Sequence, residues 1–252
     1  IARVDLEKMR IAGEHPVANL LPRVLGPLTI RPGTEMLTQT AGNASTRMVT
    51  FSRAVGTSYM LLFSEYEMRV MLDGAVQQVP AVSTAIASGS WSDVSTSPAT
   101  ATGGASLTFA ATSSASAKLR QTVTVALADR TLDNVLRVVV GRGPVVLRIG
   151  TTAGGEDLLA DATLDTGTHK ISVVPNAATI YVELRSDDPV ERTVSSINFE
   201  AVYLGGAGDL VIPTPWSMTN VVALRTQQSI DVLYCGDGYN QQRQIEHRGP
   251  LS

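Results

Sequence analysis

The chain has 252 residues, of which 44% are hydrophobic and 17% are charged, and its formal net charge at pH 7 is −3. These values exclude a disordered tail and a broadly basic nucleic-acid-binding protein. The single cysteine, Cys235, excludes an intrachain disulfide and a cysteine-based zinc cluster. No apolar run is long enough to span a bilayer, so we expect no membrane insertion. From the isoleucine at position 1 we expect a piece of a longer protein.

The first 37 residues combine a predicted helix with a rigid turn. Residues 5–11 mix good helix formers, with Asp5 as an N-cap and Gly13 as a stop. The apolar stretch 19–37 is interrupted by three prolines and two glycines and contains Arg31-Pro32-Gly33-Thr34. Proline followed by glycine predicts a type II turn there. We expect this stretch to fix the backbone at contacts with neighbouring strands or subunits.

Two β regions with different composition follow. The first is a predicted antiparallel meander with strands at 46–52, 58–63, 66–72 and 75–79 and a hairpin turn at Asp73-Gly74. Residues 83–116 are rich in small residues, but Trp91 and the alternation at 105–110 favour strands over a linker. Further strands are expected at 118–125, 134–140, 145–150, 169–174, 180–185 and 196–204. Short, regularly spaced strands with glycine-rich turns are typical of a β-sandwich or jelly roll.

After a glycine-rich hinge at 205–208, the last part of the chain resembles the part before residue 83 in sequence character. We expect an extended, proline-fixed segment at 209–216, a helical turn at 218–224 and a buried strand at 229–235. The predicted fold is all-β: a split platform domain of residues 1–82 and 206–252, with a β-sandwich or jelly roll of residues 83–205 inserted into it. The platform would be a meander, propeller-like or barrel-like.

Two stretches of the split domain resemble one family of bacteriophage proteins. Residues 2–8 (ARVDLEK), Asn19-Leu20-Leu21-Pro22, Gly26 and Arg31-Pro32-Gly33-Thr34 are similar to the amino-terminal signature of the tail tubular "nozzle" proteins of short-tailed phages. Residues 211–216 (VIPTPW) and 224–234 (LRTQQSIDVLY) are similar to a "PTPY…L…QSADVLY" stretch of that family. The sequence departs from the family pattern at Trp216, where tyrosine is common, and at Ile230, where a small residue is usual.

The resemblance implies a structural role in the virion tail. Copies assembled in the host cytoplasm would form a hexameric ring beside tail adaptor and tail fibre or spike proteins. DNA would leave through the lumen without sequence-specific binding, which the near-neutral charge favours, because each neutralised phosphate adds affinity. A closed ring needs heterologous contacts between subunits. We expect these contacts at Arg31, Pro32, Gly33, Trp216 and Arg225.

The inserted segment looks like a jelly-roll module of the carbohydrate-binding or galactose-binding type. Trp91 and Tyr181 could each present a flat ring to a sugar, or each could anchor the core of its domain. The sequence therefore predicts a tail nozzle-type structural protein. The alternative is an adhesin whose sandwich recognises a host glycan, and a tail-tip or adaptor role in a long-tailed phage is a variant of the first interpretation.

No catalytic, cofactor or metal site is predicted. The histidines have no metal-ligand spacing, and Cys235 ends an apolar strand as a buried residue would. No phosphate-binding glycine motif or acid/base pair is present, so a glycan depolymerase is the weakest hypothesis. One acidic cluster could coordinate calcium or form a solvated loop. It comprises Glu156, Asp157, Asp161 and Asp165.

Overall fold

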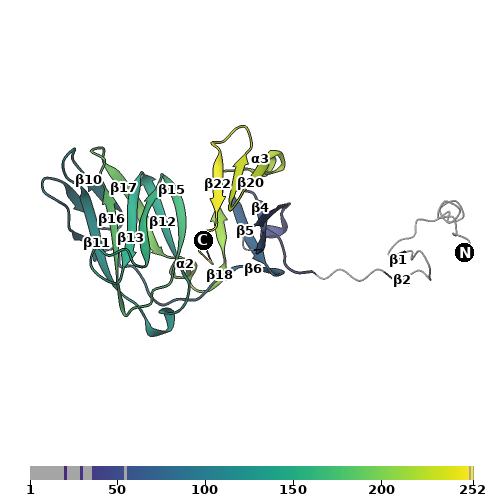
Figure 1. Cartoon of the computed structure of the whole chain (residues 1–252), viewed down its shortest axis with the longest axis horizontal. Coiled ribbons are helices and arrows are strands. Elements are labelled where there is room, and N and C mark those ends of the chain that lie inside the picture. The colour runs from purple at the N-terminus through teal and green to yellow at the C-terminus, as the bar shows by residue number, and fades with distance from the viewer. Residues whose placement is uncertain (1–19, 22–28, 31–35, 54–55, 250, 252) are drawn as a thin grey trace, which may run out of the picture. The chain divides into compact units, whose positions relative to one another are not determined.

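The structure is a computed structural model that describes residues 20–21, 29–30, 36–53, 56–249 and 251 (Figure 1). The chain divides into two compact units, residues 1–37 and 38–252. In the first unit, β1 (Leu20–Leu21) and β2 (Thr29–Ile30) pair antiparallel. The predicted helix at 5–11 and the predicted turn at 31–34 lie outside the described residues.

The second unit consists mainly of antiparallel strands, so the all-β prediction is confirmed. Its regular helices are short: α2 (Glu200–Leu204), α3 (Met218–Ala223) and the 3-10 turns η1 (Ala41–Asn43) and η2 (Leu127–Asp129). The sheets of the described part stay open, which corrects the barrel-like alternative for the platform. No helix within the described ranges is both long and apolar enough to cross a membrane.

Strands that precede the sandwich in the chain pair with strands that follow it. One sheet has the order β19-β5-β4-β3, with the bounds Val211–Pro213, Glu67–Leu72, Ser58–Ser64 and Arg47–Ser52. Another sheet, β20-β21-β22, is built only from strands after the sandwich, with the bounds Arg225–Ser229, Val232–Gly236 and Arg243–Glu246. Short pairs join β6 (Ala75–Val76) to β5 and β7 (Gln78–Val79) to β18 (Gly208–Asp209). Asp73 and Gly74 both have positive φ, as a tight two-residue hairpin turn requires.

One hydrophobic core connects these sheets. Trp216 is 1% exposed and meets Phe63 edge to face, with ring centroids 5.7 Å apart. Leu224 and Cys235 lie in the same core. The side chain of Ser217 accepts a hydrogen bond from the Asn220 N–H and caps α3, which confirms the predicted helical turn. Residues 49–72, before the sandwich, and residues 212–245, after it, therefore share one core, while the domain boundaries themselves stay a prediction.

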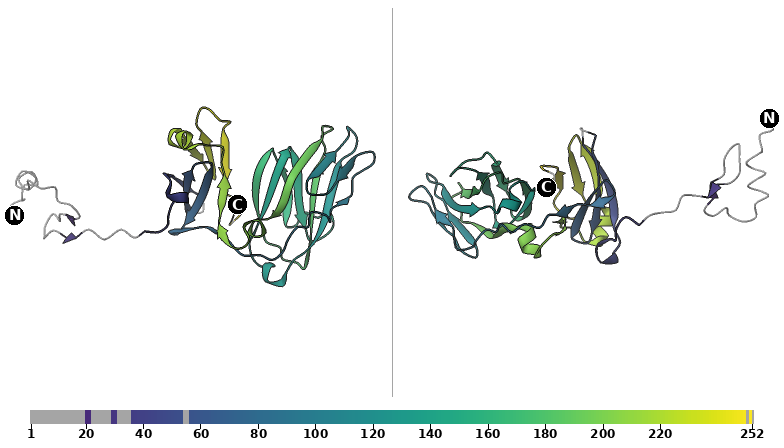
Figure 2. Two further views of the ribbon diagram at one scale, coloured as in Figure 1. Left: turned by 180° about the vertical axis from the view of Figure 1, so that it is seen from behind. Right: turned by 90° about the horizontal axis from the view of Figure 1, so that it is seen from below.

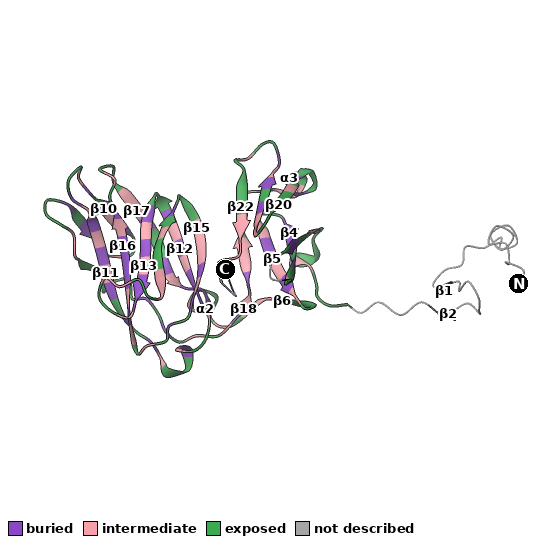
Figure 3. Cartoon of the chain, viewed as in Figure 1, coloured by how far each residue is buried: buried purple, intermediate pink, exposed green. Residues whose placement is uncertain are grey.

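Two five-stranded antiparallel sheets make up the sandwich (Figure 2). The first has the order β15-β12-β17-β10-β9, with the bounds Gly167–Val173, Asn134–Arg142, Arg192–Phe199, Leu107–Ala110 and Thr100–Thr102. The second has the order β14-β13-β16-β11-β8, with the bounds Leu159–Leu164, Val145–Gly150, Thr179–Ser186, Ala117–Thr124 and Ser92–Asp93. Inward side chains of both sheets form one core. In Figure 3 the strands of the sandwich carry purple, buried stretches beside pink and green ones.

Three sequence predictions need correction. Residues 196–204 were expected to be one strand, but β17 ends at Phe199 and α2 follows, closed by Gly205 at φ 76°. Burial of Glu200 beside Lys170 and the left-handed glycine favour a helical turn over continued strand alternation. The expected strand at 229–235 begins only at Val232, because Ile230 forms a turn with φ 52°. Strands β14, β20 and β22, whose sequences are poor in β-branched residues, were not predicted.

A buried carboxylate binds Ser83 and Thr84, the residues at the start of the predicted sandwich. Asp129, 2% exposed, lies in η2. Its Oδ2 accepts hydrogen bonds from the backbone N–H and hydroxyl groups of Ser83 and Thr84, at 2.7–3.2 Å. Burial alone would raise the pKa of the Asp129 carboxyl, but these hydrogen bonds outweigh burial and hold the pKa below its ordinary value.

We expect Asp129→Asn to lower the free energy of unfolding at pH 7 by about 1–3 kcal/mol, because the amide accepts these donors less well. A lowered folded-state pKa stabilises the protein above the unfolded pKa of about 4, and this stability is lost as pH falls through the folded value. The wild type should therefore lose stability more steeply on acidification than the variant. Urea unfolding at several pH values measures this, with Asp73→Asn, at an exposed turn, as the control. Equal pH dependence of wild type and Asp129→Asn would contradict the assignment.

Candidate functional site

A groove of about 320 Å³ opens beside strand β17, past the point where its pairing with β10 ends. Strand β12 pairs with β17 as far as Phe199, whereas β10 pairs with β17 only at residues 192–194. On the β10 side of β17, residues 195–198 therefore have no partner among the described strands. The gap is lined instead by loop residues Ile86, Ser88, Trp91, Gly104 and Ala105.

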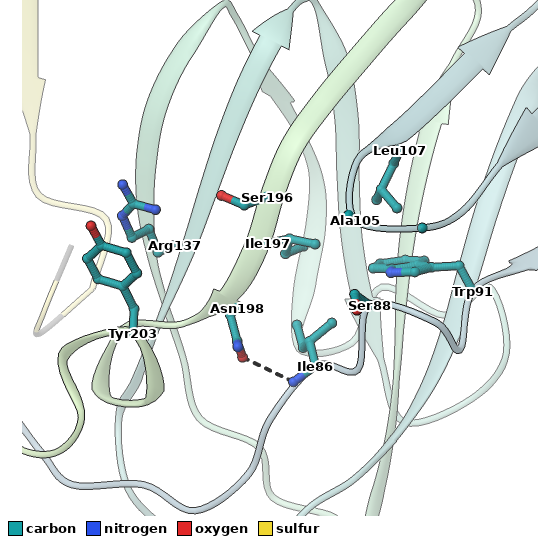
Figure 4. A pocket seen from close by; sticks show the side chains of 11 residues that line it. Ile86, Ser88, Trp91, Ala105, Leu107, Arg137, Ser196, Ile197, Asn198 and Tyr203 are labelled. Atoms are coloured by element: carbon teal, nitrogen blue, oxygen red, sulfur yellow. Dashed lines mark hydrogen bonds between the residues drawn. The ribbon is translucent and has the colours of Figure 1, made fainter.

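Aromatic rings stand at opposite sides of this groove (Figure 4). Trp91 lies on one side and Tyr203 on the other, with apolar side chains between them. Those apolar residues are Ile86, Leu107 and Ile197. The polar lining residues are Ser88, Arg137, Ser196 and Asn198. The groove therefore combines flat apolar faces with hydrogen-bonding groups.

The position of Trp91 depends on a close approach by the chain after β9. A Cβ atom added at Gly103 would lie 2.4 Å from the Cβ of Trp91, which is too close for any side chain. The half-buried indole also packs against the sandwich core, so its placement is determined from two sides. Glycine at 103 is thus required for the tryptophan to border the groove.

Arg137 and Tyr203 form the other side. The guanidinium carbon of Arg137 lies 4.1 Å from the centroid of the Tyr203 ring, a cation–π contact. Its Nε lies 3.7 Å from Oε2 of Glu200. Helix α2 carries both Glu200 and Tyr203, so the helical turn that replaces the expected strand also builds this side of the groove.

The side-chain amide of Asn198 lines the groove, and two hydrogen bonds fix its orientation. Its Oδ1 accepts hydrogen bonds from the backbone N–H groups of Ile86 (3.1 Å) and Phe199 (2.9 Å). These two donors assign the oxygen end of the amide, so the NH₂ end is the free end. Nothing within the described ranges accepts a hydrogen bond from that NH₂ group. It is a donor available to a ligand.

Lys170, which lies opposite Arg137 on the neighbouring strand β15, forms a buried ion pair with Glu200. Lys170 Nζ is 2.5 Å from Glu200 Oε1, and the two side chains are 7% and 3% exposed. The same ammonium donates to the backbone carbonyl of Val211. Burial lowers the pKa of Lys170, and the hydrogen bond and charge of Glu200 oppose that shift. Glu200 therefore has two cationic neighbours.

Only one of the two aromatics predicted to stack on a sugar lies at this groove. Trp91 lines it, whereas Tyr181 lies on β16, in the opposite sheet, and is half-buried. Sequence reasoning did not identify Arg137, Asn198 or Tyr203. Their grouping follows from the register of β12 against β17 and from the helical turn after β17, which no local pattern indicates.

Of the residues predicted for subunit contacts, the structure describes Trp216 and Arg225. Trp216 is buried in the core of its own chain, and Arg225 is exposed on β20. Arg31, Pro32 and Gly33 lie outside the described residues.

Burial accounts for Cys235, and hydrogen bonds within the chain engage two carboxylates of the acidic cluster. Cys235 is buried, and burial raises the pKa of its thiol to about 11. In the acidic cluster, Asp161 accepts two hydrogen bonds from Arg148, at 2.7 and 2.9 Å, and Asp157 accepts from Thr151. Within the described residues, no group of three or more histidine, cysteine, aspartate or glutamate side chains could hold a metal ion.

Comparison of this sequence with protein-family models gives no match, and comparison with curated proteins gives none either. The resemblance to nozzle proteins therefore stays a prediction carried by residues 2–34 and 211–234.

Proposed function

We propose that the chain is a non-enzymatic structural protein of a bacteriophage tail, of the nozzle type. The observation that supports this most is the placement of the second resembling stretch. Residues 211–213 pair as β19 with β5, and Trp216 fills the core beside Phe63. The stretch that carries the resemblance is thus a framework segment, as expected for a shared architecture.

In this proposal copies of the chain form a closed ring, with adaptor and fibre or spike proteins as neighbours. DNA passes through the lumen without sequence-specific binding, and a net charge of −3 disfavours tight binding of a polyanion. Arg225, exposed on β20, is a candidate for a contact between subunits.

Electron microscopy of the purified protein tests the ring. Closed rings of one uniform size are expected, because heterologous contacts close when the rotation between neighbours is constant. Arg225→Glu should weaken the rings, and Arg248→Glu, at another exposed arginine of the split domain, serves as the matched control. Monomers at every concentration tried would contradict the proposal.

A second function, recognition of a saccharide by the sandwich, is supported by the groove. A sugar presents an apolar face of C–H groups and a rim of hydroxyls. Trp91 and Tyr203 offer rings for the apolar face, and the Asn198 amide and the two serine hydroxyls offer hydrogen bonds for the rim. An adhesin role on the host surface would use this site.

Removing either groove aromatic should weaken saccharide binding. We expect Trp91→Ala and Tyr203→Ala each to reduce the affinity for host-surface glycan by about ten-fold or more, since an aromatic contact contributes about 0.5–1.5 kcal/mol beyond its buried area. Tyr181→Ala is the matched control, because it removes an aromatic of the same module outside the groove. Binding of fluorescent protein to host cells measures the effect. Equal loss in all three variants would contradict a site in the groove.

A further inference from the structure

We propose that the groove selects an acidic saccharide, one whose ring carries a carboxylate or a similar oxyanion, and that Arg137 binds this group. The inference rests on the second proposed function, saccharide recognition. It adds the class of sugar and the residue that distinguishes it.

The guanidinium of Arg137 is held in place before any ligand binds. Its guanidinium carbon lies over the Tyr203 ring, 4.1 Å from the ring centroid, and its Nε lies 3.7 Å from Oε2 of Glu200. In the described part of the chain, neither terminal nitrogen donates a hydrogen bond. The two Nη groups can therefore donate in parallel to the two oxygens of one carboxylate, the geometry that arginine matches best.

The charge around this arginine favours an anion. Glu200 is shared between Arg137 and Lys170, at 3.7 and 2.5 Å. Two cations thus share one carboxylate, and one positive charge is left without a counter-charge in the cluster. Lys170 is buried, whereas Arg137 borders the groove, so a ligand can approach this charge only through Arg137.

The polar groups beside Arg137 suit the rest of an acidic sugar. Ser196 and Asn198 lie near it on β17, and the free NH₂ of Asn198 is a donor. No aspartate or glutamate is among the lining residues, so no carboxylate lines the groove to repel an acidic ring. Trp91, on the far side, can hold a neighbouring sugar of the same chain by its apolar face (Figure 4).

An array of immobilised oligosaccharides tests the inference with the whole chain. The array carries uronic-acid-containing, sialylated, sulfated and uncharged oligosaccharides of matched length. Binding confined to the acidic oligosaccharides supports the proposal. Trp91-dependent binding of uncharged oligosaccharides alone would overturn it while leaving saccharide recognition intact, and binding of none would overturn both.

Arg137→Gln should reduce the affinity for an array-positive acidic oligosaccharide by about ten-fold or more, the loss of a hydrogen bond to a charged group. Arg137→Lys should restore only part of it, because an ammonium cannot donate in parallel. Arg225→Gln, on the split domain, is the matched control and should bind as the wild type does. If Arg137→Gln does not fold, the salt dependence of wild-type binding decides instead. Affinity that does not fall between low and high salt would overturn the proposal.

Discussion

Trp216→Ala is expected to lower the free energy of unfolding by about 3–5 kcal/mol, the usual cost of removing a fully buried large aromatic. The side chain is 1% exposed and packs edge to face on Phe63. The backbone carbonyl of Trp216 also accepts a hydrogen bond from the Tyr66 N–H, at 2.8 Å. Because this bond fixes the backbone, we expect the surroundings to collapse little into the cavity that the alanine variant leaves. Urea unfolding of the full chain, followed by circular dichroism, measures the loss.

Two further variants separate the core role of Trp216 from a subunit-contact role. The indole N–H is buried and finds no acceptor within the described residues, so Trp216→Phe removes an unpaired donor and should cost much less than the alanine variant. Trp91→Ala, at a half-buried tryptophan, should also cost less. A Trp216→Ala protein with wild-type stability and altered assembly alone would contradict the core assignment.

Lys170→Met is expected to destabilise the chain by about 3–5 kcal/mol, because it leaves the buried carboxylate of Glu200 without its closest cation. The pair is 2.5 Å apart and its side chains are 7% and 3% exposed. Arg137, 3.7 Å from the other carboxylate oxygen, compensates only in part. The lost hydrogen bond from Lys170 to the carbonyl of Val211 adds to the cost.

A double-mutant cycle tests this ion pair. Replacing both partners, as in Lys170→Met with Glu200→Leu, should recover most of the stability, because two apolar side chains leave no buried charge behind. Chemical unfolding of the wild type, both single variants and the double variant gives the coupling energy. A double variant that is as unstable as the sum of the single variants would contradict a direct interaction.

Much of the fold could be predicted from alternation and turn residues. The strands at 118–125 and 180–185 follow a clear two-residue period, and the structure pairs them in register as β11 and β16. Asp73-Gly74 indicated its hairpin because few other residues adopt positive φ there. Strand ends were less predictable. Residues 200–204 continue an apolar pattern, and the tertiary burial of Glu200, together with the left-handed Gly205, favours a helical turn there.

The site could be predicted only in part. Trp91 was identifiable because it is a large aromatic residue within a tract of small residues, which indicates either a core anchor or a binding surface. Its partners were not, since Arg137 and Tyr203 belong to segments that meet only through strand register and the turn of α2. Tyr181 had an equally good sequence signal, but β16 places it in the other sheet.

Immunogold electron microscopy of phage particles, with antibody raised against the purified chain, tests the proposed tail role most directly. Gold particles are expected at the tail, at one end of the virion, and none over the capsid. Label spread over the capsid, or recovery of the protein only outside the particles, would contradict a structural role in the tail.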